Sequence, residues 1–160
     1  MESVHKVVPN NELLRDLIAL VKEGKRVTLP VRGNSMQPFI IGDRDSVELV
    51  GPAVVSVGDV VLAWINGDRY VIHRVIRIYG ENFDQIQLMG DGNLTDNEYC
   101  HISDIKAKAE YIIGGDGSRR YIYSRKMVLL SRIWWYLRPL RRIILAVYRR
   151  TWLKFLLRKK

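Results

Sequence analysis

The sequence predicts a mostly β (α+β) protein, with a twisted antiparallel β domain, an N-terminal helix and a C-terminal basic amphipathic helical region. Short β-branched runs separated by turn dipeptides fill residues 26–113. A stretch of helical periodicity precedes them, and a basic, tryptophan-containing stretch follows them. We therefore divide the chain into a helical segment at residues 1–25, a β domain at 26–124 and a helical tail at 125–160.

The N-terminal helix is expected to begin at Asn10-Asn11 and to end at Gly24. An asparagine can cap the first turn, and a glycine just past the last turn can adopt the left-handed conformation that ends a helix. Apolar residues between them recur at helical spacing: Leu13, Leu14, Leu17, Ile18, Leu20 and Val21. We expect this apolar face to pack on an edge of the sheet.

The β domain is expected to contain six strands. The runs that predict them are VTLPV (27–31), DSVELV (45–50), DVVLAWI (59–65), RYVIHRVIRI (69–78), DQIQLM (84–89) and KAEYII (108–113). The Asn66-Gly67 pair between the third and fourth runs is typical of a two-residue hairpin turn. Strands joined by such turns form an antiparallel sheet.

Charge and cysteine content limit the classes of function. Residues 125–160 contain 12 Lys+Arg and no Asp or Glu, whereas residues 1–124 contain 14 Lys+Arg and all 17 Asp+Glu. The single cysteine, Cys100, excludes an intrachain disulfide. Glu2 and polar residues stand where a signal peptide would be apolar, and no apolar run approaches the roughly 18–20 residues that span a bilayer. We expect a cytoplasmic protein with peripheral membrane association.

Four boxes in the β domain carry a family resemblance. In chain order they are GNSMQP (33–38), VGDVVLAW (57–64), VIHRVI (71–76) and MGDGNLTDN (89–97). Their order and spacing over residues 28–113 resemble the signal peptidase I superfamily, which also includes the LexA-type self-cleaving proteases. The His73-Arg74-Val75 segment is similar to the histidine branch of the endoplasmic-reticulum and archaeal type. The resemblance implies a signal-peptidase-like fold and a serine endopeptidase.

The catalytic candidates are Ser35 and His73. A serine hydroxyl needs a base within hydrogen-bond reach to accept its proton as it attacks a carbonyl, and histidine titrates near neutral pH. A histidine base in turn needs a carboxylate to orient it. The resemblance offers Asp96 and then Asp91 for that role, although Asn97 stands where the family has a second aspartate.

Further roles are expected around the nucleophile. The Ser35 N–H is one oxyanion donor in the family, and Asn34 is our candidate for the second because Gly33 replaces the usual hydroxyl residue. Met36 and Pro38, in the same turn, are candidates for substrate contact. We expect no metal and no cofactor, because the oxygen ligands in DGNLTD and the adjacent Cys100-His101 lack calcium or zinc spacing.

The tail has the composition of a helix that lies in a membrane interface. Its apolar residues recur every three or four positions: Leu130, Ile133, Trp134, Leu137, Leu140, Ile144, Tyr148, Trp152 and Phe155. Pro139 is expected to kink or break it. Attraction to anionic lipid is worth on the order of 1 kcal/mol per basic residue. Our membrane-binding candidates are Trp134, Trp135, Arg138, Arg142, Arg149, Arg150 and Trp152.

Alternatives stay open for the tail and for the whole protein. The tail could pack on its own domain or on a partner protein, and nucleic acid is a weaker alternative because the apolar face is too continuous. A LexA-type self-cleaving regulator is the enzymatic alternative, although no Ala-Gly or Cys-Gly site precedes Ser35. The non-enzymatic alternative is an inactive superfamily member that serves as a membrane-associated adaptor.

Overall fold

The structure, a computed structural model, describes residues 10–152 of the 160-residue chain. Its elements are α1 (Asn10–Lys22), β1 (Val27–Pro30), β2 (Ser46–Val50), β3 (Val60–Ile65), β4 (Arg69–Tyr79), β5 (Gln85–Met89), β6 (Asn97–His101), η1 (Ile102–Asp104), β7 (Ile105–Ile113), β8 (Arg119–Tyr121), α2 (Arg125–Tyr136), η2 (Arg138–Leu140) and α3 (Arg141–Arg150). The predicted mostly β class is confirmed.

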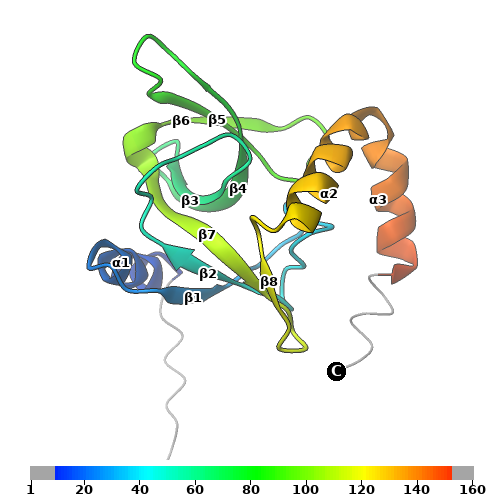
Figure 1. Ribbon diagram of the computed structural model, residues 1–160, viewed down its shortest axis with the longest axis horizontal. Coiled ribbons are helices and arrows are strands. Elements are labelled where there is room, and N and C mark those ends of the chain that lie inside the picture. Colours follow the sequence, from blue (N-terminus) through cyan, green and yellow to red (C-terminus); the bar gives the residue numbers. More distant parts are fainter. Residues whose placement is uncertain (1–9, 153–160) are drawn as a thin grey trace, which may run out of the picture.

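The eight strands form one antiparallel sheet in the order β1-β2-β7-β3-β4-β5-β6, with β8 paired to β7. The sheet curls strongly, so that β6 contacts β3 as well as its partner β5. Figure 1 shows the curled sheet with α1 on one side and with α2 and α3 on the other. This curl brings side chains from distant strands to the same place.

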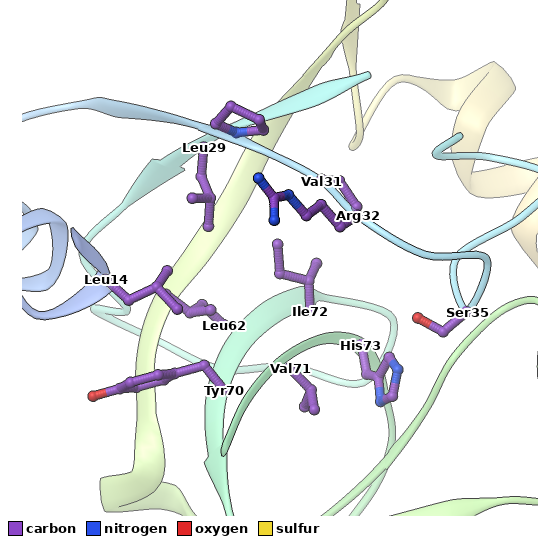
Figure 2. A pocket seen from close by; sticks show the side chains of 11 residues that line it. Leu14, Leu29, Val31, Arg32, Ser35, Leu62, Tyr70, Val71, Ile72 and His73 are labelled. Carbon is purple, nitrogen blue, oxygen red and sulfur yellow. The ribbon is translucent and has the colours of Figure 1, made fainter. Parts of the chain in front are cut away.

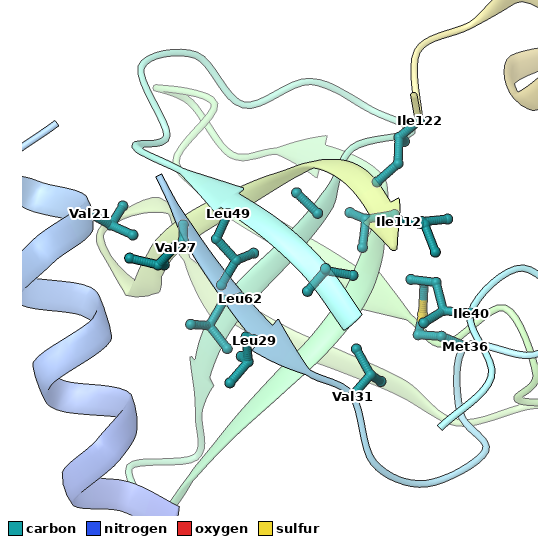
Figure 3. Close-up of a cluster of buried hydrophobic side chains, with 14 of the residues drawn as sticks. Val21, Val27, Leu29, Val31, Met36, Ile40, Leu49, Leu62, Ile112 and Ile122 are labelled. Atoms are coloured by element: carbon teal, nitrogen blue, oxygen red, sulfur yellow. The ribbon is translucent and has the colours of Figure 1, made fainter. Parts of the chain in front are cut away.

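Two clusters of apolar side chains form the core, and β3 lies between them. Val60 and Leu62 belong to the first cluster, together with Leu14, Ile18 and other buried residues of α1, β1, β2 and β7 (Figure 3). Val61, Ala63 and Ile65 point to the second cluster, inside the curl. Because both faces of β3 are buried, its sequence is a continuous apolar run rather than an alternating one.

The helix α1 packs against β1 and β7. β1 is an edge strand with one partner, β2, in the described part of the chain, a position that tolerates Pro30 because the missing N–H breaks no ladder. Strands β6 and β8 were not predicted, and β7 begins at Ile105, three residues before the predicted run. Within residues 10–152, no helix is both long and apolar enough to cross a bilayer.

Candidate active site

Ser35 lies in the loop between β1 and β2, and this loop is anchored from within. The side chains of Met36 and Ile40 are fully buried in the first core cluster (Figure 3). Gly33 has a φ of 79°, which favours glycine, and a Cβ at Gly42 would overlap the Gly33 carbonyl oxygen. The loop therefore folds tightly on itself and leaves Ser35 half-buried at its turn.

A second loop, residues 90–93, holds the Ser35 loop from the other side. The Gly92 N–H donates to the Ser35 carbonyl oxygen at 2.7 Å. A Cβ at Gly90 would overlap that same oxygen and would lie 3.0 Å from Ser35 Cβ. The predicted GNSMQP and MGDGNLTDN boxes are thus in direct contact, and glycine is required where they meet.

His73 lies on β4 at the point where pairing with β5 stops. β5 pairs with β4 only from Arg74 onward, whereas β3 pairs with β4 along residues 69–74. The His73 side chain is buried, with 6% of its surface exposed, and it lies near Ser35 (Figure 2). Ser35 and His73 line the same two cavities, so the structure brings these two predicted residues together.

The carboxylate that contacts His73 is Glu98, which the sequence analysis missed. Glu98 Oε2 faces His73 Nδ1, and Glu98 Oε1 accepts a hydrogen bond from Arg69 Nη2 at 2.6 Å. The hydrogen bond from His73, aided by the charge of Arg69, holds the pKa of Glu98 below its usual range. An ionised carboxylate only accepts, so Nδ1 carries the proton and Nε2 is left as the basic nitrogen.

The two predicted aspartates take other positions. Asp91 is buried and forms a two-point ion pair with Arg74, at 2.8 Å from Nε and 2.7 Å from Nη2. Asp96 is exposed beside the second cavity, and its one side-chain hydrogen bond in the described residues comes from Thr95 Oγ1. Neither contacts His73. The carboxylate at His73 Nδ1 is instead that of Glu98, which the curl of the sheet brings across from β6.

Two cavities meet at Ser35 and His73. One, of about 220 Å³, exposes polar and apolar surface in similar amounts and is lined by Leu14, Leu29, Pro30, Val31, Arg32, Leu62, Tyr70, Val71 and Ile72 besides the two catalytic candidates (Figure 2). The other, of about 630 Å³, has a mostly polar lining of Asn66, Arg69, Tyr70, Val71, Asn93, Asp96, Asn97, Glu98 and Tyr99 beside the same pair. The smaller cavity is therefore the one with aliphatic side chains in its lining, and the larger one has charged and amide side chains.

The Ser35 loop also carries the predicted oxyanion donors, Ser35 and Asn34, and the predicted substrate contacts, Met36 and Pro38. No hydrogen bond within the described residues uses the Ser35 N–H, so this donor is free to face an oxyanion. Asn34 is exposed, and its Oδ1 accepts from Gln37 Nε2 at 2.8 Å. Met36 is 1% exposed, so the prediction that it contacts substrate is wrong, whereas Pro38 is half-buried outside both cavities and its predicted contact stays a prediction.

The tail packs on the loops that hold the site. Trp134 is buried and donates from Nε1 to the Asp91 carbonyl oxygen at 2.7 Å, and its ring meets Phe39 edge-on at 6.3 Å. Arg149 Nε donates to Gln37 Oε1 at 3.0 Å. Trp134 therefore cannot be a membrane-binding residue, and Arg149 has a structural contact. Trp135, Arg142, Arg150 and Trp152 are exposed, and Arg138 is half-buried over the Trp135 ring.

A second serine, histidine and aspartate lie together on the surface. His101 Nδ1 is 2.9 Å from Ser103 Oγ, and its Nε2 is 3.3 Å from Asp84 Oδ2. His101 caps η1, the group is largely exposed, and it lines neither cavity. These residues provide a natural control for the Ser35 site.

Among residues 10–152, no three His, Cys, Asp or Glu side chains lie close enough to hold a metal ion. Comparison of the chain with protein-family models, with curated proteins and with solved structures finds no match.

Proposed function

We propose that the protein is a serine endopeptidase in which Ser35 is the nucleophile, His73 the general base and Glu98 the residue that orients His73. The observation that carries this proposal is the His73–Glu98 contact beside Ser35, at the junction of two cavities. A carboxylate that accepts from Nδ1 fixes the tautomer of the imidazole and leaves Nε2 to accept the proton of the serine hydroxyl. The exposed His101 group has a similar set of side chains without the cavities.

The reaction follows from this arrangement. His73 Nε2 accepts the Ser35 hydroxyl proton as Oγ attacks the scissile carbonyl carbon, and the carbonyl electron pair moves to its oxygen. The C–N bond then breaks, and His73 returns the proton to the leaving amine. Water attacks the acyl-serine, His73 accepts the water proton, and the acid is released as Ser35 is protonated again. Glu98 stays ionised and stabilises the imidazolium.

The negative oxygen of each tetrahedral intermediate needs hydrogen-bond donors. The unused Ser35 N–H is the first donor in this proposal. The contact between Gly92 and the Ser35 carbonyl oxygen fixes the orientation of the loop that carries it. Asn34 remains the candidate for the second donor, because its amide nitrogen is in the exposed part of the same turn.

The proposed substrate is an extended polypeptide segment. β1 and residues 69–72 of β4 each have one unpaired edge in the described sheet, and Leu29 of β1 and residues 70–72 of β4 line the smaller cavity. An extended chain between these edges can pair with them and place its side chains in the cavity. The site and the four boxes also support a signal-peptidase-like fold of the histidine branch, as the resemblance implies.

Digestion of a peptide library tests the proposal. Purified wild-type protein, Ser35→Ala and the control Ser103→Ala are incubated with the library, and new termini are identified by mass spectrometry. We expect cleavages that wild type and Ser103→Ala share and that Ser35→Ala lacks. Cleavages that persist in Ser35→Ala would overturn the assignment of Ser35 as nucleophile. Their absence from wild type would overturn the proposal and favour the non-enzymatic adaptor.

A further inference from the structure

We propose that the outer face of α2, η2 and α3 binds an anionic lipid surface. We call residues 125–150 the helical arm. This proposal does not depend on the chemistry of Ser35. It does depend on which face of the arm is covered by the protein itself.

The inner face of the arm is fixed to the β domain. Trp134, Arg141 and Leu145 are buried, at 7%, 2% and 2% exposure. Arg141 donates to the Trp134 carbonyl oxygen at 3.3 and 3.4 Å, which joins the end of α2 to the start of α3. Figure 1 shows both helices on the side of the sheet away from α1. The arm is therefore a fixed part of the fold, and its other face is available for a partner.

The outer face carries an apolar stripe in two parts, one on α2 and one on η2 and α3. Its members are Leu129, Ile133, Tyr136, Leu140, Ile143 and Val147, which are between 45% and 82% exposed. Leu129, Ile133 and Tyr136 are spaced four and three residues apart on α2, and Ile143 and Val147 are four apart on α3, so each helix has an exposed apolar face of its own. The predicted stripe included Trp134, Ile144 and Tyr148, which are buried or half-buried, whereas Phe155 lies outside the described residues. The exposed stripe thus shares Ile133 and Leu140 with the predicted one but differs from it at the other positions.

Basic side chains lie among and beside the stripe. Arg125 and Arg132 flank Leu129 at helical spacing, and Arg142 and Arg150 are exposed on α3. Residues 125–150 contain no acidic residue. A partner must therefore offer apolar contact and negative charge together over a broad surface.

An anionic lipid bilayer satisfies both requirements better than the alternatives. A second copy of the arm would oppose arginine to arginine without a carboxylate to compensate. Nucleic acid would use the charges, but leucine, isoleucine and valine cannot stack on bases. A lipid interface buries aliphatic side chains to the depth of the acyl boundary and attracts the arginines to its headgroups.

Vesicle flotation tests the proposal on the full chain. The vesicles contain phosphatidylcholine with or without phosphatidylglycerol, and the variants are Ile133→Ser/Ile143→Ser and the matched control Val54→Ser/Val57→Ser. Val54 and Val57 are 69% and 61% exposed outside the arm. Loss of two embedded isoleucines is expected to weaken binding to phosphatidylglycerol vesicles by roughly tenfold or more, while the control binds like wild type. Circular dichroism checks that both variants fold.

Three outcomes would overturn the proposal. One is wild-type protein that does not float with phosphatidylglycerol vesicles at low salt. Another is equal binding by the Ile133→Ser/Ile143→Ser variant and wild type. The third is a dimer in solution that the isoleucine variant abolishes, which would assign the stripe to a second copy. Because none of these outcomes involves cleavage, they leave the proposed peptidase activity unaffected.

Discussion

His73 and Arg74 are neighbours on β4, and each contacts one carboxylate, yet the two pairs differ in kind. Arg74 is permanently charged and forms a two-point pair with Asp91, and it also donates to the Gly58 carbonyl oxygen at 2.8 Å. His73 can gain and lose a proton, contacts Glu98 through one nitrogen and faces the cavities. Alternation along the strand directs the two side chains to opposite faces.

We therefore interpret Arg74–Asp91 as the structural pair and His73–Glu98 as the chemical pair, the one with a role in the proposed reaction. Burial opposes the charge of Arg74, but Asp91 outweighs it, so the pKa of Arg74 is raised and the pair stays ionised. That pair ties residues 90–93, and through Gly92 the Ser35 loop, to the sheet. The His73–Glu98 pair holds a proton acceptor at the cavity instead. Substitutions in the two pairs should therefore have different consequences.

The largest expected effect comes from the chemical pair. His73→Ala should lower the rate of peptide cleavage by roughly 10³- to 10⁴-fold, because Ser35 loses its base. Glu98→Gln should lower it by at least roughly 10²-fold, since the tautomer is no longer fixed. Initial rates on a peptide found in the library measure both. His101→Ala is the control, and equal losses in His73→Ala and His101→Ala would contradict the assignment.

The structural pair should affect stability first. Asp91→Asn leaves the Arg74 charge buried without its counterion, which is expected to lower the free energy of unfolding by about 3–5 kcal/mol. Glu98→Gln should cost less, about 1 kcal/mol, because it leaves no permanent charge unpaired at His73 and the glutamine oxygen can still accept from Nδ1. Urea denaturation followed by tryptophan fluorescence compares them. The distinction between the pairs fails if Glu98→Gln is as destabilising as Asp91→Asn.

The smallest expected effect is a pH dependence at Glu98. Its pKa is lowered in the folded protein by the hydrogen bond from His73. Between that lowered pKa and the usual glutamate pKa of about 4.3, the unfolded state binds more protons. The carboxylate therefore stabilises the fold above that window, and the benefit disappears as pH falls through the folded-state pKa. Urea denaturation from pH 3 to 7 should show wild type and Glu98→Gln converging at low pH, and a constant difference would contradict this.

The sequence predicted the mostly β fold class and that Ser35 and His73 lie close together, but it did not point to the contact between Glu98 and His73. The apolar run of β3 is visible because burial on both faces requires it, and β4 is visible as a long run of β-branched residues after the Asn66-Gly67 turn. β6 reads NEYCH, a polar strand with one buried residue, so its pattern does not stand out from a loop. Glu98 could have been found only by recognising residues 97–101 as a strand. In the structure this strand pairs with β5, and Glu98 lies opposite Leu88. The curl that brings Glu98 to His73 is a long-range property of the sheet.

The tail was predicted to be helical with a break at Pro139, and the structure has α2, η2 and α3 there. The orientation of its faces could not be read from the same pattern. The predicted apolar stripe continued unchanged past Pro139, and it therefore placed Trp134 and Ile144 on the face that points away from the β domain. The turn at η2 changes the helical phase, so that Trp134 and Leu145 both face the β domain.

The most direct measurement is the rate of labelling of the purified protein by a serine-reactive phosphonate, followed by intact mass. The account predicts one adduct per chain on wild type and on Ser103→Ala, none on Ser35→Ala, and labelling slowed by roughly 10²-fold or more in His73→Ala and Glu98→Gln. Unlabelled wild-type protein, or His73→Ala labelled at the wild-type rate, would contradict it.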